Sequence, residues 1–230
     1  MLERVSQRPG SRLVPFHEYR GLILLPQRAV WREATRTLFI ADAHLGKAAT
    51  FRALGQPAPK GTTRDNLHRL DALVERFNPA RLVFLGDLFH ARQAHAPGVA
   101  AAFVDWRRRR AALPLTLVRG NHDQRAGDPP PHFEIELVDE PFDAGGVVAR
   151  HHPLTADACK EDGATVLAGH LHPCVRLNGA ARDSVRLACF VLQERQITLP
   201  AFGAFTGGAL VRRPDVGICA IVDDQLLVSN

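Results

Sequence analysis

The sequence has few cysteines and no long apolar run, and both absences exclude classes of protein. Its four cysteines lie far apart and form no Cys-x-x-Cys pair, which argues against a zinc knuckle or a dense disulfide scaffold. No segment reaches the ~18 uninterrupted apolar residues that a membrane span needs, and residues 1–12 lack the apolar run of a signal peptide. We therefore expect a cytoplasmic protein with reduced cysteines and no membrane partner.

Aromatic residues are also scarce. The two tryptophans and the single tyrosine are too few and too scattered to predict a base-stacking surface for single-stranded nucleic acid. The formal net charge of +5 fits a polyanionic partner, but it also fits many proteins that never bind one. The arginine run 107–110 would spread around a helix instead of forming one stripe, so we expect a solvated helix end there.

The 230 residues, 46% of them hydrophobic, alternate apolar runs with helical stretches. Apolar runs at 22–25, 37–41, 82–85 and 115–118 predict strands, and the periodic stretches 64–77 and 97–112 predict helices. Further runs at 134–138, 147–150, 165–168, 185–192 and 217–222 predict strands joined by short connections, and hence a second, more antiparallel sheet. No linker or repeat divides the chain, so we expect one α/β domain over residues 1–230.

Polar clusters follow several of the predicted strands. They are Asp42-x-His44, Gly86-Asp87, Gly120-Asn121-His122-Asp123, His151-His152 and Gly169-His170-x-His172. Each cluster alone is more often a turn, a strand end or an ordinary core histidine than a functional site. Because the carboxyl ends of strands in α/β sheets meet at one rim, clusters that are distant in sequence can form one site. Their occurrence together, each just after an apolar run, predicts such a site.

The residue types in these clusters indicate a pair of metal ions. Carboxylate and neutral imidazole together suit Mn, Fe, Zn or Ni, whereas Mg or Ca would favour oxygen ligands alone. The candidate ligands are Asp42, His44, Asp87, Asn121, one of His151 or His152, His170 and His172. A tetrahedral zinc would need only four of them, whereas two ions that share a bridging carboxylate, for which Asp87 is the candidate, would use all. Two cations roughly 3.5–4 Å apart can lower the pKa of a shared water and direct the resulting hydroxide at phosphorus.

Other polar residues near these motifs are candidates for further roles. As an imidazolium, His122 could protonate the leaving oxygen or stabilise transition-state charge, with Asp123 to orient it. Lys47, in a predicted glycine-containing loop, and Arg119 could contact a substrate phosphate, although a solvated side chain fits equally well. His90 could contact substrate or support a metal ligand.

The order of the motifs, DxH, GD, GNHD, H and GHxH over residues 42–172, resembles the calcineurin-like metallophosphoesterase superfamily. The resemblance implies a four-layer α/β/β/α sandwich of two mixed sheets with a two-metal site at one end. It further implies that Asp42, His44 and His172 bind one ion, that Asn121, His170 and a histidine at 151 or 152 bind the other, and that Asp87 bridges them. At His151-His152-Pro153 the sequence departs from relatives that have one histidine followed by glycine. We expect His151 to be the ligand and His152 to lie beside it as a support or substrate contact.

Segments 38–47, 86–90 and 199–203 are similar to the ligase-associated DNA damage response endonucleases within this superfamily. The similarity implies a phosphodiesterase or nuclease, with Mn²⁺ as the expected metal, that acts on DNA in bacterial repair beside an ATP-dependent DNA ligase and a helicase. One alternative keeps the site but changes the substrate to a cyclic nucleotide, a nucleotide-sugar lipid or a phosphomonoester. Another is a nonenzymatic metal-binding scaffold, against which the complete ligand set argues.

Overall fold

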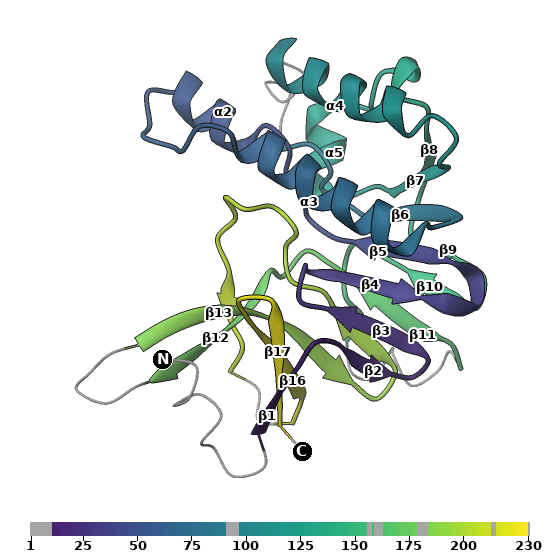
Figure 1. Ribbon diagram of the computed structural model, residues 1–230, viewed down its shortest axis with the longest axis vertical. Coiled ribbons are helices and arrows are strands. Elements are labelled where there is room, and N and C mark those ends of the chain that lie inside the picture. Colours follow the sequence, from purple (N-terminus) through teal and green to yellow (C-terminus); the bar gives the residue numbers. More distant parts are fainter. Residues whose placement is uncertain are drawn as a thin grey trace.

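Two β-sheets and a layer of helices make up the part of the chain that the computed structural model describes, namely residues 11–90, 97–155, 158, 163–178, 184–212 and 215–229 (Figure 1). Within those residues no helix combines the length and the apolar character required to cross a membrane.

The first sheet has seven strands in the order β2-β3-β4-β5-β6-β7-β8. Their bounds are β2 (His17–Tyr19), β3 (Leu22–Leu25), β4 (Ala29–Arg32), β5 (Thr37–Ile40), β6 (Arg81–Leu85), β7 (Leu115–Val118) and β8 (Ile135–Val138). Pairing is antiparallel from β2 to β5 and parallel from β5 to β8. Strands β5 and β7 are buried throughout, as expected of parallel strands covered on both faces.

Helices lie between the parallel strands and cover one face of this sheet (Figure 1). They are α2 (Lys47–Ala53), α3 (Thr62–Phe77), α4 (Pro97–Arg109) and α5 (Asn121–Ala126), with short 3-10 turns η1 (Glu33–Thr35) and η3 (Pro131–Phe133). The apolar stripe of α3 buries Leu67, Leu70 and Leu73 against the sheet. Phe103 and Trp106 of α4 are fully buried in the same core.

The second sheet has ten strands, and most of its pairs are antiparallel, as expected. Its strands are β1 (Ser11–Val14), β9 (Phe142–Asp143), β10 (Val147–Ala149), β11 (Thr165–Ala168), β12 (Pro173–Asn178), β13 (Ser184–Gln193), β14 (Gln196–Thr198), β15 (Ala209–Leu210), β16 (Gly217–Val222) and β17 (Gln225–Ser229). The order is β1-β17-β16-β13-β14-β11-β10-β9, and β12 pairs with β13 and β15. The parallel pairs β10–β11 and β11–β14 place the ends of β10 and β11 at a common edge.

A common core joins the two sheets. Phe39 and Leu85 of the first sheet are fully buried in one cluster with Leu167, Phe190 and Ile197 of the second. The sheets therefore pack face to face, which confirms the α/β sandwich of two mixed sheets. In the described residues every α-helix precedes β8 in the chain, and none follows it.

The predicted strands and helices are all present, with differences at their ends. The second predicted helix ends at Arg109, short of residue 112. The expectation of a solvated helix end at 107–110 was wrong for Arg107, which is 7% exposed and donates hydrogen bonds to the carbonyl oxygens of Phe133 and Leu113. Arg110 pairs with Asp71, so the arginine run ties α4 to α3.

Candidate metal centre

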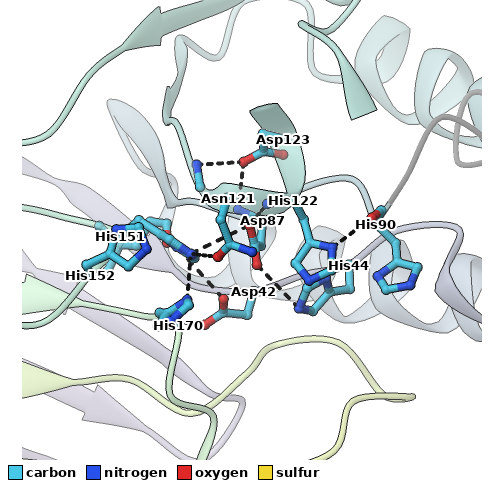
Figure 2. Close-up of polar contacts among 12 residues, drawn as sticks. Asp42, His44, Asp87, His90, Asn121, His122, Asp123, His151, His152 and His170 are labelled. Atoms are coloured by element: carbon cyan, nitrogen blue, oxygen red, sulfur yellow. Dashed lines mark hydrogen bonds and ion pairs between the residues drawn. The ribbon is translucent and has the colours of Figure 1, made fainter. Parts of the chain in front are cut away.

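Loops at the carboxyl ends of five strands bring the predicted ligands together. Asp42 follows β5, Asp87 follows β6 and Asn121 follows β7, while His151 and His170 follow β10 and β11 of the other sheet. Figure 2 shows these side chains converging from the two sheets. The site thus lies where the carboxyl ends of strands from both sheets meet.

One group of ligand atoms belongs to Asp42, His44 and His172, which lie close enough to hold one ion. Nε2 of His172 is 3.3 Å from Oδ1 of Asp42 and 3.2 Å from Nε2 of His44. Asp42 is fully buried, and His44 is 3% exposed. This is the set that the family resemblance implies for the first metal.

A second group surrounds His151, which is fully buried. Its Nε2 lies 3.0 Å from Oδ1 of Asn121 and 3.1 Å from Nδ1 of His170. Its Nδ1 lies 3.0 Å from the carbonyl oxygen of Leu85, which can only accept, so Nδ1 carries the proton and the lone pair of Nε2 faces the cluster. This geometry favours His151 over His152 as the ligand.

Asp87 lies between the two groups and is 2% exposed. Its Oδ2 is 3.8 Å from Nε2 of His44, and its Oδ1 is 3.6 Å from Nε2 of His151. Each oxygen of this carboxylate therefore faces a different group of ligands, which is the arrangement that a bridging ligand requires.

Buried atoms without partners indicate that these residues fit divalent cations. Among the described residues, Oδ1 of Asp42 and Nδ1 of His44 are buried and have no hydrogen-bond partner. A buried carboxylate oxygen without a partner is costly, and a cation at the site would remove that cost. Burial, with a smaller contribution from the charge of Lys47, holds the pKa of His44 well below its usual range. The imidazole therefore stays neutral, which is the form that binds metal.

The backbone at the ligands is strained. Five of the seven predicted ligands have positive φ angles, which L-residues rarely adopt: Asp42 (54°), His44 (44°), Asp87 (51°), His170 (68°) and His172 (46°). Hydrogen bonds between the loops hold these conformations, since the amide of His44 donates to the carbonyl oxygen of Asp87 at 2.9 Å. Backbone strain of this kind costs about 1–3 kcal/mol per residue and gathers at functional sites.

The glycines of the motifs allow the ligands to approach the backbone. A Cβ atom at Gly169 would lie 2.7 Å from Oδ2 of Asp42, and a Cβ at Gly86 would overlap the ring of His151. The loops can approach this closely only because both positions lack a side chain.

His122 lies beside the ligands with one ring nitrogen already engaged. Its Nδ1 is 2.9 Å from the carbonyl oxygen of His90, so Nδ1 donates a proton there and Nε2 remains for chemistry. The ring centroid of His122 lies 5.0 Å from that of His44 and 4.9 Å from that of His90 (Figure 2). Burial, followed by the charge of Lys47, lowers the pKa of His90 to about 4, which keeps its ring neutral.

Asp123 has partners other than the predicted one. Its carboxylate accepts hydrogen bonds from the backbone amides of Asp87 (2.7 Å), Gly120 (3.0 Å) and Phe89 (3.2 Å). We expected it to orient His122, but the structure turns the carboxylate toward the loops that follow β6 and β7. Asp123 therefore fixes the backbone that carries Asp87, the candidate bridging ligand. Burial raises the pKa of Asp123 to about 7, although these amide hydrogen bonds act against the shift.

The predicted substrate contacts have different outcomes. Lys47 is the first residue of α2, so the prediction of a loop at this position was wrong. Burial lowers the pKa of its ammonium, although the negative charges of Asp87 and Asp42 act against the shift. Arg119 pairs with Asp128 at 3.0 Å and Asp139 at 3.1 Å, so its guanidinium is held by acidic side chains.

His152 contacts Glu140, a residue that the sequence did not indicate. Its Nδ1 lies 2.8 Å from Oε1 of Glu140, and Oε2 of Glu140 accepts the backbone amides of His151 (2.8 Å) and His152 (2.9 Å). Glu140 therefore anchors the loop that carries His151, the candidate ligand. No motif surrounds Glu140, so sequence reasoning had no signal with which to find it.

Comparison with known proteins agrees with this geometry. The family model described as calcineurin-like phosphoesterase matches residues 35–157, just over half of the chain. Among solved structures, the nuclease MPE of Pseudomonas putida is 39% identical, with a TM-score of 0.76 over 90% of this chain and 96% of that chain. A conserved protein of Streptococcus pneumoniae TIGR4, described as a predicted phosphoesterase, is 15% identical with a TM-score of 0.34 over 81% and 83% of the two chains, a similarity too low to carry an argument. The search of curated proteins gave no match. This chain belongs to the calcineurin-like phosphoesterase family.

Proposed function

We propose that the chain is a two-metal phosphodiesterase that cleaves DNA. The observation that carries the proposal is the position of Asp87, whose two oxygens face two separate groups of metal-type ligands. A single structural ion would not require a buried carboxylate between two such groups. The similarity to the P. putida nuclease MPE supports a nucleic acid as the substrate.

Each group of ligands has a role in this proposal. Asp42, His44 and His172 would hold one divalent cation, Asn121, His151 and His170 would hold the other, and Asp87 would contact both. When bound, two such cations lower the pKa of a water molecule and neutralise charge on the phosphoryl oxygens.

The side chain of His122 would assist the departing group. Because the carbonyl oxygen of His90 holds Nδ1, Nε2 of His122 is the nitrogen that can donate a proton to the leaving oxygen. Lys47 would add positive charge beside the phosphate, since its ammonium is half-buried and interacts electrostatically with Asp87 and Asp42.

The finer assignments rest on ligand chemistry and on the family resemblance. Mixed carboxylate, amide and imidazole ligands suit Mn²⁺, with Fe, Zn or Ni as alternatives. A role in bacterial DNA repair beside an ATP-dependent ligase and a helicase, and with it a cytoplasmic location, follows from the resemblance to the ligase-associated endonucleases. The core shared by the two sheets supports a single domain over residues 1–230.

Hydrolysis of bis-p-nitrophenyl phosphate and p-nitrophenyl phosphate by Mn²⁺-loaded protein tests the proposal. We expect preferential cleavage of the diester, and a loss of about 100-fold or more in His122→Ala with the metal content unchanged. Asp87→Ala is expected to lose both metal and activity. Preference for the monoester would indicate a phosphatase, and metal-loaded protein without turnover would indicate a binding scaffold.

A further inference from the structure

A polar cavity of about 270 Å³ opens beside the predicted metal ligand His172. Its lining includes Arg28, Arg186, Cys174 and Thr206 together with His172. The loop between β14 and β15, which forms one wall, reaches the helical layer, where Phe205 packs on Phe51 of α2 with ring centroids 5.6 Å apart. The cavity therefore adjoins the metal centre and lies on the side of His172.

Arg28 is held at this cavity by its backbone and by hydrogen bonds. It occupies the turn between β3 and β4 with φ of 64°, a conformation that costs a non-glycine residue free energy. Its Nη1 donates to the carbonyl oxygens of Ala201 (3.1 Å) and Gly203 (3.2 Å). These bonds fix the guanidinium at the wall, and among the described residues no acceptor takes its other nitrogens.

Arg186 supplies a second positive charge from β13. Its Nη2 donates to Sγ of Cys174 at 3.2 Å and to the carbonyl oxygen of Gly208. None of the described residues that line the cavity is acidic. The two guanidinium groups therefore line a recess in which no described lining residue carries a negative charge, a setting that attracts anions.

We propose that this cavity binds a phosphate of the substrate strand next to the phosphodiester at the metal centre. The inference rests on the proposed nuclease function and adds a specificity to it. His172 both lines the cavity and lies 3.3 Å from Asp42, so a group in the cavity is next to one of the candidate ligands. A substrate with a single phosphate cannot use both positions, whereas a nucleic-acid strand carries neighbouring phosphates that can.

Arg186→Gln provides the first test because Arg186 is exposed and its replacement does not disturb the core. We would measure kcat/KM for a short single-stranded oligodeoxynucleotide and for bis-p-nitrophenyl phosphate, which has only one phosphate. The ratio of the two values is expected to fall about tenfold in the variant, since a hydrogen-bonded ion pair with phosphate is lost. The slope of log kcat/KM for the oligonucleotide against log salt concentration is expected to become shallower by about 0.7, whereas Arg186→Lys keeps the wild-type slope.

Arg108→Gln is the matched control, because it removes the same charge from an exposed position on α4 that does not line the cavity. It is expected to leave the ratio at the wild-type value. Equal ratios in wild type and Arg186→Gln, or an equal fall in Arg108→Gln, would overturn the phosphate site while leaving the nuclease proposal intact. Hydrolysis of bis-p-nitrophenyl phosphate by wild type without any cleavage of the oligonucleotide would overturn both.

Discussion

Replacement of Asp123 separates a structural role from a catalytic one. The carboxylate is 3% exposed and accepts three backbone amides, those of Asp87 and Gly120 at Oδ2 and that of Phe89 at Oδ1. Alanine would leave all three buried amides without this acceptor. Asparagine can keep its single oxygen on the Oδ2 side, and then only the amide of Phe89 loses its acceptor.

The expected magnitudes follow from the number of amides left without a partner. Each buried donor without an acceptor costs about 1–3 kcal/mol, so Asp123→Asn should lower the free energy of unfolding by roughly 1–3 kcal/mol. Asp123→Ala should lower it by roughly 3–6 kcal/mol. The upper end is reduced because the buried carboxylate is itself costly to keep charged, as its raised pKa indicates. A loss of this size is a large part of the ~5–15 kcal/mol that stabilises a typical protein.

Urea unfolding of metal-free protein, followed by circular dichroism, measures both variants. The order wild type, Asp123→Asn, Asp123→Ala is expected in the transition midpoints, with unchanged m-values. Asp123→Ala protein that unfolds at the wild-type urea concentration but has lost diester hydrolysis would refute the reasoning, because it would return Asp123 to a purely catalytic role.

Three further changes test other parts of the structure. Glu140→Ala should weaken metal binding about 10–100-fold, because the loop of His151 loses its anchor. Calorimetric titration measures the affinity, and that of Glu140→Gln should fall between those of Glu140→Ala and wild type. Gly169→Ala should lower the bound metal per chain in elemental analysis, since the added methyl group would overlap a ligand carboxylate; full metal content would show that the loop adapts. Burial alone would raise the pKa of Asp71, but hydrogen bonds from Arg110 and a neighbouring arginine outweigh it and lower the pKa below 3.8. The ion pair therefore stabilises the protein above that pH, and this stability is lost as the pH falls through the lowered pKa. Wild type should then lose its stability advantage over Asp71→Asn in acid. A difference in urea midpoints that stays constant with pH would contradict this.

The clustering of the candidate metal ligands could be predicted from the sequence because their signals are local. An apolar run followed directly by Asp42 or Asp87 identifies a strand end, and strand ends of α/β sheets meet at one edge. Asn121, the first residue of a short helix, likewise follows closely on the end of an apolar strand, β7. The sequence left positions 151 and 152 open, and the geometry favours His151 because the two side chains have different hydrogen-bond partners.

The contacts that hold the site could not be predicted, because they join residues far apart in sequence. Asp123 binds the amide of Asp87, 36 residues away, and nothing near either residue indicates this pairing. Arg107 is buried because η3 supplies a carbonyl acceptor from 26 residues further along. Arg28 reaches carbonyl groups more than 170 residues away. Such contacts depend on how the two sheets and the helical layer pack.

The metal content of Mn²⁺-reconstituted protein tests the central claim most directly. Elemental analysis by mass spectrometry should find about two ions per chain in wild type, as expected of a pair of cations that share a carboxylate. Asp87→Ala should hold clearly fewer, because it removes a carboxylate whose two oxygens face the two groups of candidate ligands. One ion per chain in wild type, or an unchanged content in Asp87→Ala, would contradict the two-metal account.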